Sequence, residues 1–368
     1  MRPGARDEPV MNPHDIGIVR CGSRVHLEDL RALRERGLAI PHNYSSWPLH
    51  CTIGSWRWCR VTAPDGRLIS GFAVHLTPSR AVPGTRIGQI DRLGRKLHEE
   101  LAQQMGTVLN EVARRILCLL RLDVRVFDED PARRAQLCQS LRNAGWTCDE
   151  RHRQYSHTLM LKLAPSESEV LRGFSTRVRS TIKKALRSPE LRFAPVVGRG
   201  YANRVRHLYS LAFARTGGVP PPIDIDGILQ DSSNGESSLL IGAFAREGRP
   251  PEDLVALAWA RLHGDHAVLE INASERSPLF NHLSPGFGLM LHLIDWAIEH
   301  DAQWIDLGGL SSTHPAASDP MRGIVEFKMR FSSDFRDVAE EWHIDPNPLL
   351  AAAASMARSI ARTVCGLR

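Results

Sequence analysis

The first half of the chain alternates between short segments with strand-like patterns of apolar residues and longer segments with helical spacing. Strands are predicted at residues 69–76, 123–127 and 155–163. Helices are predicted at residues 100–120 and 131–144, and Gly145 supplies a stop signal for the second helix. This order of elements favours a mixed α/β fold.

The second half repeats this order. Strands are predicted at residues 255–262 and 267–272, followed by a helix at 286–300 and a strand at 304–307. Aligning the two halves places Asp128 opposite Asp306, half a chain length further on. The pattern therefore predicts an internal duplication of one strand–strand–helix–strand unit.

Length and composition agree with two globular domains. A chain of 368 residues exceeds one ordinary domain, and its 42% hydrophobic and 24% charged residues exclude a disordered chain. No apolar run approaches the roughly 20 residues of a membrane span. The N-terminus lacks the apolar stretch of a secretory signal, so we expect a cytoplasmic protein. The seven cysteines form no C-x-x-C motif, and the sequence predicts no metal site.

The chain is mildly basic, with 47 lysine and arginine residues against 41 acidic residues and a net charge of +6. This excess is compatible with an anionic partner, which could be a nucleic acid, a nucleotide cofactor or an anionic membrane face. Only five of the cations are lysines, so arginine is the default cation here and each lysine is more informative.

Residues 168–188 have a clear helical pattern. An apolar stripe is formed by Leu171, Phe174, Val178, Ile182 and Ala185. Another face carries the cations Arg172, Arg179, Lys183 and Arg187. This spacing predicts a cationic ridge for phosphates, whose binding would weaken steeply with salt. The alternative is an ordinary solvated helix face.

A second candidate anion site is the start of the helix predicted near residue 286. Ser284 can cap this helix, and Gly286 and Gly288 lie in its first turn although each glycine costs about 1 kcal/mol relative to alanine. Close approach of an anion to backbone N–H groups would explain the glycines. The alternative is a tight strand-to-helix turn. The G-x-G-x-x-G and Walker patterns of nucleotide sites are absent.

Residues 323–331 alternate like a strand, with Phe327 on one face and Lys328 and Arg330 on the other. This segment follows a loop rich in Gly, Ser and Pro at residues 308–320, long enough to be functional. An ammonium facing a cleft could hold the oxygen that becomes negative when an acyl carbonyl is attacked. The alternative is an exposed strand face of mixed charge.

Two acidic residues are candidates for a general base. Asp306 lies near a strand end, where it could be a base or an anchor, and Glu270 lies in the middle of a strand. No serine or cysteine occurs in the G-x-S-x-G pattern of a covalent nucleophile. The tail at residues 349–368 has the spacing of an amphipathic helix, which could dock on the protein or lie on a membrane surface.

Several of these segments, in this order, resemble the Fem-type peptidyltransferases and the wider superfamily of GNAT-like acyltransferases. The resemblance lies in the basic helix at residues 177–185, the segment 208–218 with Arg215, the strand 304–309 with Asp306, and Phe327 with Lys328. It covers about residues 165–350 well and the first half by pattern alone. The turn beginning at Ser284 is similar to a related acyltransferase group.

The resemblance implies two tandem GNAT-like domains, each a twisted mixed sheet flanked by helices. We expect a first domain at residues 1–165 that is degenerate or binds the acceptor, and a second domain at 166–348 with the donor site. A C-terminal amphipathic helix at 349–368 would follow. The resemblance also implies direct acyl transfer to an amine without a covalent intermediate. Phe327 and Lys328 match the family pair at the reacting ester end of the tRNA.

The leading hypothesis is an aminoacyltransferase that uses aminoacyl-tRNA as co-substrate, needs no bound cofactor, and acts on a peptidoglycan precursor or a small biosynthetic amine. Lys328 would stabilise the oxyanion, Phe327 would pack against the donor, and Asp306, Glu270 or the substrate would take the proton. The expected anion contacts are Arg172, Arg179, Lys183, Arg187, Arg215, Arg330, Ser284, Gly286 and Gly288.

Two alternatives remain open. The first is an acyl-CoA-dependent N-acyltransferase on the same fold, although the [QR]-x-x-G-x-[GA] pattern of CoA-using relatives is absent at residues 284–288. The second is a non-catalytic protein that binds tRNA or the inner membrane surface through its basic face.

Overall fold

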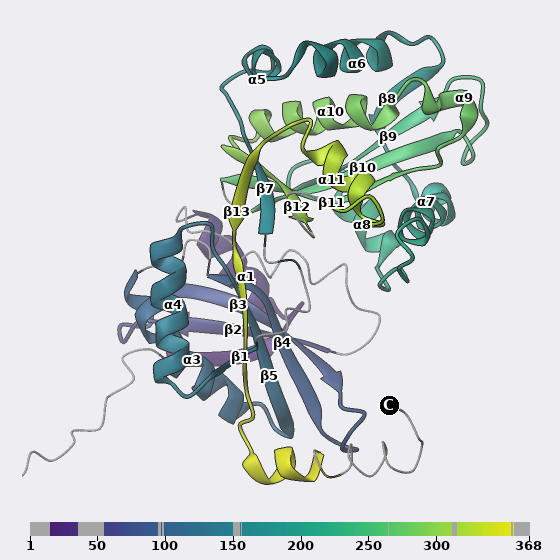
Figure 1. The fold of residues 1–368 in the computed structure, drawn as a ribbon. Coiled ribbons are helices and arrows are strands. Elements are labelled where there is room, and N and C mark those ends of the chain that lie inside the picture. The colour runs from purple at the N-terminus through teal and green to yellow at the C-terminus, as the bar shows by residue number, and fades with distance from the viewer. Residues whose placement is uncertain are drawn as a thin grey trace, which may run out of the picture.

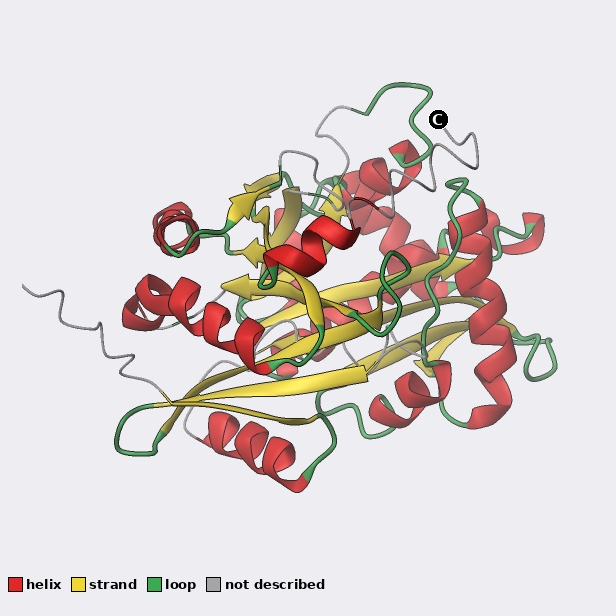
Figure 2. Ribbon diagram, turned by 90° about the horizontal axis from the view of Figure 1, so that it is seen from below, coloured by secondary structure: helices red, strands yellow, loops and turns green. Residues whose placement is uncertain are grey.

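The computed structural model describes residues 15–35, 55–94, 97, 99–149, 155, 157–263, 265–310, 315–354 and 356. Within these residues the chain forms two mixed sheets of seven strands, both flanked by helices (Figures 1 and 2). The predicted α/β class with two tandem domains is confirmed. No helix in this described part combines the length and the apolar character that a membrane crossing needs.

The first sheet has the order β1-β2-β3-β4-β5-β14-β6, in which β4 and β5 are parallel and the other neighbours antiparallel. Helices α3 (Glu99–Arg115) and α4 (Pro131–Asn143) bury one face, and α1 (Arg24–Glu35) covers Trp58 on the other. The strands are β1 (Asp15–Arg20), β2 (Ser55–Thr62), β3 (Leu68–Pro78), β4 (Arg86–Gly94), β5 (Leu119–Phe127), β6 (Thr147–Cys148) and β14 (Ala339–Ile344).

The second sheet has the order β13-β7-β12-β11-β10-β9-β8, with β11 and β12 parallel. Its strands are β7 (His157–Lys162), β8 (Leu191–Pro195), β9 (Ser238–Ala245), β10 (Leu254–His263), β11 (His266–Ser274), β12 (Trp304–Leu310) and β13 (Asp334–Asp337). Its helical segments are α5 (Glu167–Gly173), α6 (Thr176–Arg187), η1 (Arg199–Tyr201), α7 (Ala202–Ala214), α8 (Ile225–Asp231), α9 (Pro278–Asn281), α10 (Pro285–Glu299) and α11 (Arg322–Lys328).

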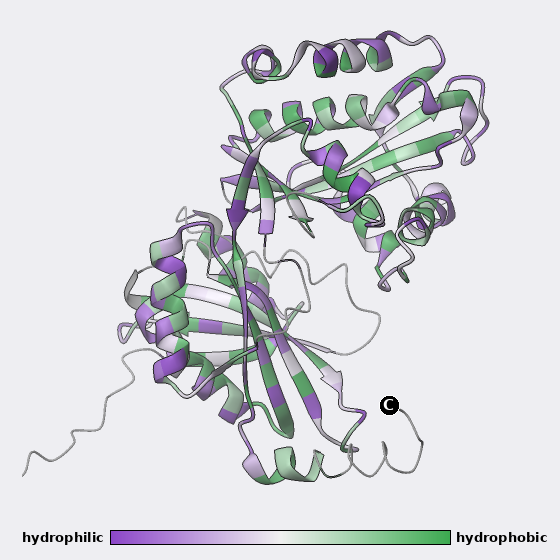
Figure 3. Cartoon of the chain, in the orientation of Figure 1, coloured by the Kyte–Doolittle hydropathy of each residue, from purple (hydrophilic) through white to green (hydrophobic). Residues whose placement is uncertain are grey.

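Helix α10 is the central helix of the second domain because nearly all of its length is apolar. Residues of α10, α5 and α6 share one core with one face of the sheet, and α7 and α8 bury the other face. Figure 3 shows α10 as mostly hydrophobic, whereas hydrophilic residues recur along α6. The basic helix therefore lies on the outside of the second domain, over α10 (Figure 1).

The duplicated unit predicted from the sequence is present in both halves, as β3-β4-α3-β5 and as β10-β11-α10-β12. The two aspartates lie at different places along their strands, because Asp128 follows the end of β5 whereas Asp306 is the third residue of β12. Both aspartates follow an apolar stretch, but the strands differ in length, with nine residues in β5 and seven in β12.

The two sheets do not divide the chain at residue 165. Strand β7 precedes that position but belongs to the second sheet, and β14 returns from the second half to lie between β5 and β6. Figure 1 shows the segment of β13 and β14 (yellow) running from one sheet to the other. The alternation of apolar residues indicates which face of a strand is buried, but not which strand it pairs with.

Three predicted elements need correction. The helix at 168–188 is broken, because Phe174 is extended after Gly173 and the Ser175 side chain accepts a hydrogen bond from the N–H of Val178 to begin α6. The predicted helix at 100–120 ends at Arg115, and β5 begins at Leu119.

The segment 323–331 is largely helical, not a strand, and α11 ends at Lys328. Its apolar residues fit both periods, since Ile324, Phe327 and Phe331 are also spaced as on one helix face. Val325 is buried in the core of the second domain, and an Arg322–Glu326 pair at 2.6 Å supports the helical turn.

Only the beginning of the predicted C-terminal helix lies within the described residues. Residues 348–354 and 356 are helical, and the Asn347 side chain accepts hydrogen bonds from the N–H groups of Leu349 and Leu350. Leu349 and Met356, two members of the predicted apolar stripe, are exposed. Residues 355 and 357–368 of the predicted helix lie outside the described residues.

Candidate active site

The candidate site lies where two parallel strands of the second sheet separate. The register of β11 with β12 runs from His266 opposite Trp304 to Val268 opposite Asp306. Beyond this point β11 continues beside β10 as far as Ser274, whereas β12 continues beside β7. We call the region beyond Val268 and Asp306 the β11–β12 divergence.

The Lys328 side chain reaches into this divergence from the end of α11. Its ammonium donates a hydrogen bond to the carbonyl oxygen of Gly309 at 3.0 Å. Gly308 has a φ of +84°, and a Cβ at this position would lie 3.3 Å from the Lys328 Nζ and 3.5 Å from the Leu269 carbonyl oxygen. Glycine at 308 therefore supplies both the backbone conformation and the space that the ammonium uses.

Asp306 anchors the base of the divergence. Its carboxylate is fully buried, and one oxygen accepts hydrogen bonds from the Thr158 hydroxyl and from the Gly308 N–H, the latter at 2.7 Å. The other oxygen lies 3.9 Å from the guanidinium of Arg92, a residue of β4 in the first domain. The carboxylate thus fixes the irregular backbone of β12 at Gly308 and joins the two domains.

The pKa of Lys328 is lowered from 10.5 to about 8. Burial of the ammonium is the main cause, and the positive charge of Arg92 acts in the same direction. The Asp306 carboxylate opposes both effects. Lys328 is therefore mostly protonated at neutral pH, and it loses its charge at a lower pH than an exposed lysine.

Phe327 lies beside Lys328 and reaches the start of α10. Its ring packs against Phe287 with centroids 5.4 Å apart and against Phe331 at 5.2 Å. A Cβ on Gly286 would lie 3.4 Å from the Phe327 ring and 4.0 Å from the Asn272 side-chain oxygen. The first turn of α10, the end of α11 and the C-terminal part of β11 therefore meet at this point.

Glu270 is the extra residue of a β-bulge, because Trp259 faces Ile271 while its neighbour Ala260 faces Leu269. Its side chain is partly buried, next to the Leu269 carbonyl that borders the divergence. A bulge re-aims a side chain relative to the regular strand. Glu270 is the acidic residue within β11, and it follows Leu269, whose carbonyl oxygen borders the divergence.

The structure shows the backbone and packing of the residues predicted at the start of α10, and anion binding by them stays a prediction. Ser284 has a φ of +52° and its side chain makes no capping hydrogen bond, so the expected serine cap is wrong. A Cβ on Gly288 would lie 2.4 Å from the Phe193 ring of β8, which explains the glycine by close packing. Gly286 is the residue of this turn that borders Phe327.

The cations predicted on one helix divide into two groups. Arg172, on α5, pairs with Glu169 at 3.4 Å, and Arg179 donates to the carbonyl oxygens of Arg172 and Phe174 at the break between the helices. Lys183 and Arg187 are exposed on α6, and neither has an ion pair or hydrogen bond with the described residues.

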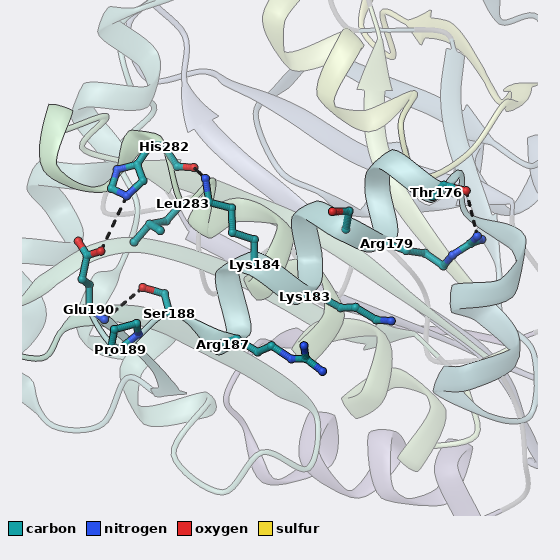
Figure 4. A pocket seen from close by; sticks show the side chains of 11 residues that line it. Thr176, Arg179, Lys183, Lys184, Arg187, Ser188, Pro189, Glu190, His282 and Leu283 are labelled. Atoms are coloured by element: carbon teal, nitrogen blue, oxygen red, sulfur yellow. Dashed lines mark hydrogen bonds and ion pairs between the residues drawn. The ribbon is translucent and has the colours of Figure 1, made fainter.

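A groove of about 840 Å³ runs beside the exposed cations of α6. Figure 4 shows Lys183 and Arg187 extending from the helix, while Lys184 turns toward the carbonyl of His282 and donates to it at 3.0 Å. Glu190 lies 3.8 Å from the His282 ring at the end of the groove. The groove therefore presents positive charge that is not neutralised by the described carboxylates along α6.

The other two predicted anion contacts lie elsewhere. Arg215 donates to the Ser274 carbonyl at the end of β11, and burial together with the nearby Arg276 lowers its pKa. Arg330 is exposed just beyond α11. Neither belongs to the α6 groove.

Sequence reasoning did not identify Arg92, Thr158 or Gly308 as members of the site. Thr158 and Arg92 reach Asp306 from β7 and β4, which are distant from it in sequence. The available sequence signal was the Gly308-Gly309 pair after a strand, since glycine pairs often mark positive φ.

The comparisons with known proteins agree with this fold. Residues 172–316 match the family model described as an acetyltransferase (GNAT) domain. The solved structure of FemX matches with a TM-score of 0.65 at 15% identity, covering 82% of this chain and 91% of that chain. No curated protein matches the sequence.

Two further solved structures match with lower TM-scores. L-PGS from Bacillus licheniformis has a TM-score of 0.48 at 12% identity, covering 91% of this chain and 96% of that chain. A tandem GNAT protein from the clavulanic acid pathway has a TM-score of 0.49 at 13% identity, covering 91% and 99%. Residues 172–316 therefore form a GNAT-type acyltransferase domain, and the fold of the chain is similar to that of FemX.

Proposed function

We propose that this protein is an aminoacyltransferase that moves an aminoacyl group from aminoacyl-tRNA to an amine acceptor. The observation that carries the proposal is the Lys328 ammonium in the β11–β12 divergence, held by the Gly309 carbonyl. A cation at this point can bind the carbonyl oxygen that becomes negative when an amine attacks an ester. Its pKa of about 8 keeps it charged at neutral pH.

In the proposed reaction, the acceptor nitrogen forms a bond to the ester carbonyl carbon. The bond from that carbon to the ribose oxygen of the tRNA breaks. The proton lost by the amine goes to Glu270 or to the substrate, and the departing ribose oxygen takes up a proton. Asp306 is fully buried behind Gly308, so we assign it the anchoring role instead of the role of base.

The α6 groove supports a phosphate-bearing donor such as tRNA, because it presents Lys183 and Arg187 without described acidic partners. The FemX fold likeness and the absence of the CoA-type pattern at residues 284–288 point in the same direction. The match to an acetyltransferase domain favours the alternative, an acyl-CoA-dependent N-acyltransferase. In either reading the groove would receive the phosphates of the donor.

The experiment that tests the proposal is incubation of the purified protein with a mixed pool of charged tRNAs and cell-extract amines. Mass spectrometry should find amines that have gained an aminoacyl residue, and pretreatment with RNase should abolish these products. Products that survive RNase and need acyl-CoA would support the alternative. Salt-sensitive tRNA binding without any product would contradict both.

Reversing the exposed charges of α6 should weaken donor binding. For the double variant Lys183→Glu/Arg187→Glu, we expect the KM for aminoacyl-tRNA to rise about tenfold, with kcat nearly unchanged. For each phosphate that the variant no longer binds, the slope of log affinity against log salt concentration should flatten by about 0.7–0.9. The measurement is steady-state kinetics between 50 and 200 mM salt, roughly the range over which phosphate binding is sensitive.

The matched control for this double variant is Arg199→Glu/Arg206→Glu. These two exposed arginines belong to η1 and α7 of the same domain and lie outside the groove. They change the net charge by the same amount. An equal rise in KM for both double variants would show that overall charge, rather than the groove, attracts the donor.

The transfer rate should fall as the pH rises through about 8, because Lys328 then loses the charge that stabilises the oxyanion. Folding lowers the pKa of this lysine from 10.5 to about 8, so its contribution to the stability of the folded protein rises between pH 8 and pH 10.5. Unfolding caused by this lysine therefore does not explain the fall in transfer rate. The measurement is kcat/KM against pH, corrected for spontaneous ester hydrolysis. In Lys328→Arg, which stays charged, the fall near pH 8 should be absent.

A further inference from the structure

Arg92 occupies an irregular position in the first domain. Strand β4 pairs with β5 through Ile90 opposite Val124 and then Leu93 opposite Val126, so one extra residue lies in a bulge. Arg92 lies in this bulge with a φ of +54°. A non-glycine residue in this conformation costs about 1 kcal/mol or more, and such strained positions cluster at functional sites.

The Arg92 side chain points from the bulge to the second domain. Its guanidinium lies 3.9 Å from the buried Asp306 carboxylate and 4.9 Å from the centre of the Phe127 ring. Only 16% of the side chain is exposed. The strained backbone at Arg92 thus places a positive charge of the first domain beside the Asp306 carboxylate of the second domain.

The two duplicated units differ at this location. In the second domain β11 and β12 separate beyond Val268 and Asp306, and Lys328 enters between them. In the first domain β4 stays paired with β5 as far as Gly94 opposite Phe127. The strands of the first domain therefore do not separate at the position that corresponds to the divergence. The bulge residue Arg92 of this domain instead contacts Asp306 of the second domain.

Because Asp306 pairs with Arg92, the hydrogen-bond partner of Lys328 is a backbone carbonyl and not the Asp306 carboxylate. Asp306 is paired with Arg92 in the described structure, and the Lys328 ammonium donates to the Gly309 carbonyl. If Arg92 were neutral, the buried carboxylate would be the strongest nearby attraction for the ammonium. An ammonium drawn to Asp306 would be less available to a substrate oxygen.

We propose that Arg92 is a positioning residue that neutralises Asp306 and so keeps the Lys328 ammonium directed into the β11–β12 divergence. The active site is then shared between the domains. The effect on catalysis rests on the proposed function, whereas the effect on Lys328 itself does not. Arg125 of β5 interacts electrostatically with both Arg92 and Asp306, and its acidic neighbours are Asp91 of β4 and Glu341 of β14.

The test measures the ionisation of Lys328 directly. The chain has five lysines, so a protein labelled with 13C-lysine gives few 13Cε signals, and Lys328→Arg assigns the signal of interest. In Arg92→Gln the pKa of Lys328 should rise from about 8 toward the ordinary lysine value, because a nearby positive charge is removed. Arg92→Lys should keep it near 8. The control Arg86→Gln, at an exposed position of the same strand, should leave it unchanged.

A second variant keeps the test informative if Arg92→Gln does not fold. Asp306→Asn removes the carboxylate that supports the charged form of Lys328, so the pKa should move below about 8. If Arg92→Gln folds and the titration midpoint of Lys328 does not move in it, the proposal is overturned. If Arg92→Gln does not fold, a midpoint that stays unchanged in folded Asp306→Asn overturns it.

Kinetics separate this inference from the proposed function. In Arg92→Gln we expect kcat to fall about tenfold at unchanged KM for aminoacyl-tRNA, and the alkaline fall in rate to move to higher pH. If the NMR midpoint moves but no variant transfers an aminoacyl group, the proposed function fails and the positioning role holds. If transfer is found and Arg92→Gln leaves both the midpoint and the pH profile unchanged, the positioning role fails.

Discussion

Replacing Lys328 with alanine is expected to lower the rate of aminoacyl transfer by about 10²–10³, the usual cost of losing one donor to an oxyanion. The reason is that its ammonium lies in the β11–β12 divergence, where the proposed reaction develops the negative oxygen. The fold should persist, because the change removes a charge that is already unfavourably buried. The measurement is single-turnover transfer from a charged tRNA, with thermal unfolding recorded in parallel.

The matched control is Lys162→Ala. Lys162 is an exposed lysine of the same domain at the end of β7, near the Trp304 ring. Its removal should leave the rate within about twofold, as expected for a surface substitution away from the site. A Lys328→Ala protein that keeps near-normal activity would remove Lys328 from the mechanism.

Replacing Asp306 with alanine is expected to lower the free energy of unfolding by about 3 kcal/mol. Hydrogen bonds to a charged group contribute about 1.5–3 kcal/mol each, and this carboxylate accepts from the Thr158 hydroxyl and the Gly308 N–H. The variant would also leave Arg92 without its buried partner in the second domain. Urea unfolding followed by circular dichroism measures the change.

Two further substitutions show how much of the lost stability comes from the hydrogen bonds and buried position of Asp306. Asp306→Asn keeps an acceptor oxygen for Thr158 and Gly308 and should lose only about 1–2 kcal/mol. Glu326→Gln removes a carboxylate that is half exposed in an i,i+4 pair and should change stability by less than about 0.5 kcal/mol. Equal stability of Asp306→Ala and the unchanged protein would show that the carboxylate anchors neither the turn nor the domains.

The sequence predicted those helices and strands that are marked by the spacing of apolar residues within the element itself. The strands at β3, β10 and β11 and the helices α4 and α10 lie close to their expected ranges, because each is a run of apolar residues bounded by turn or cap residues and packed in a core. The short segment containing Lys328 was misassigned as a strand because its apolar residues fit both periods. The sequence nevertheless points to Lys328, since lysine is rare in this arginine-rich chain, and its catalytic role stays a prediction.

The rest of the site depends on long-range contacts that a periodic pattern does not encode. Arg92 reaches Asp306 only because the two sheets are placed against each other, and Thr158 does so because β7 joins the second sheet. The enclosure of the Lys328 ammonium depends on the positive φ of Gly308. These features follow from tertiary structure, so single-sequence reasoning did not reach them.

The position of β14 between β5 and β6 has a consequence for synthesis of the protein on the ribosome. The first sheet needs a strand that is translated after every strand of the second sheet, so its β5 edge waits for residues 339–344. The second half therefore has the opportunity to form its sheet first, against the usual N-to-C order of domain folding. A nascent chain that stalls before residue 339 leaves an unpaired strand edge, which is a target for chaperones and for aggregation.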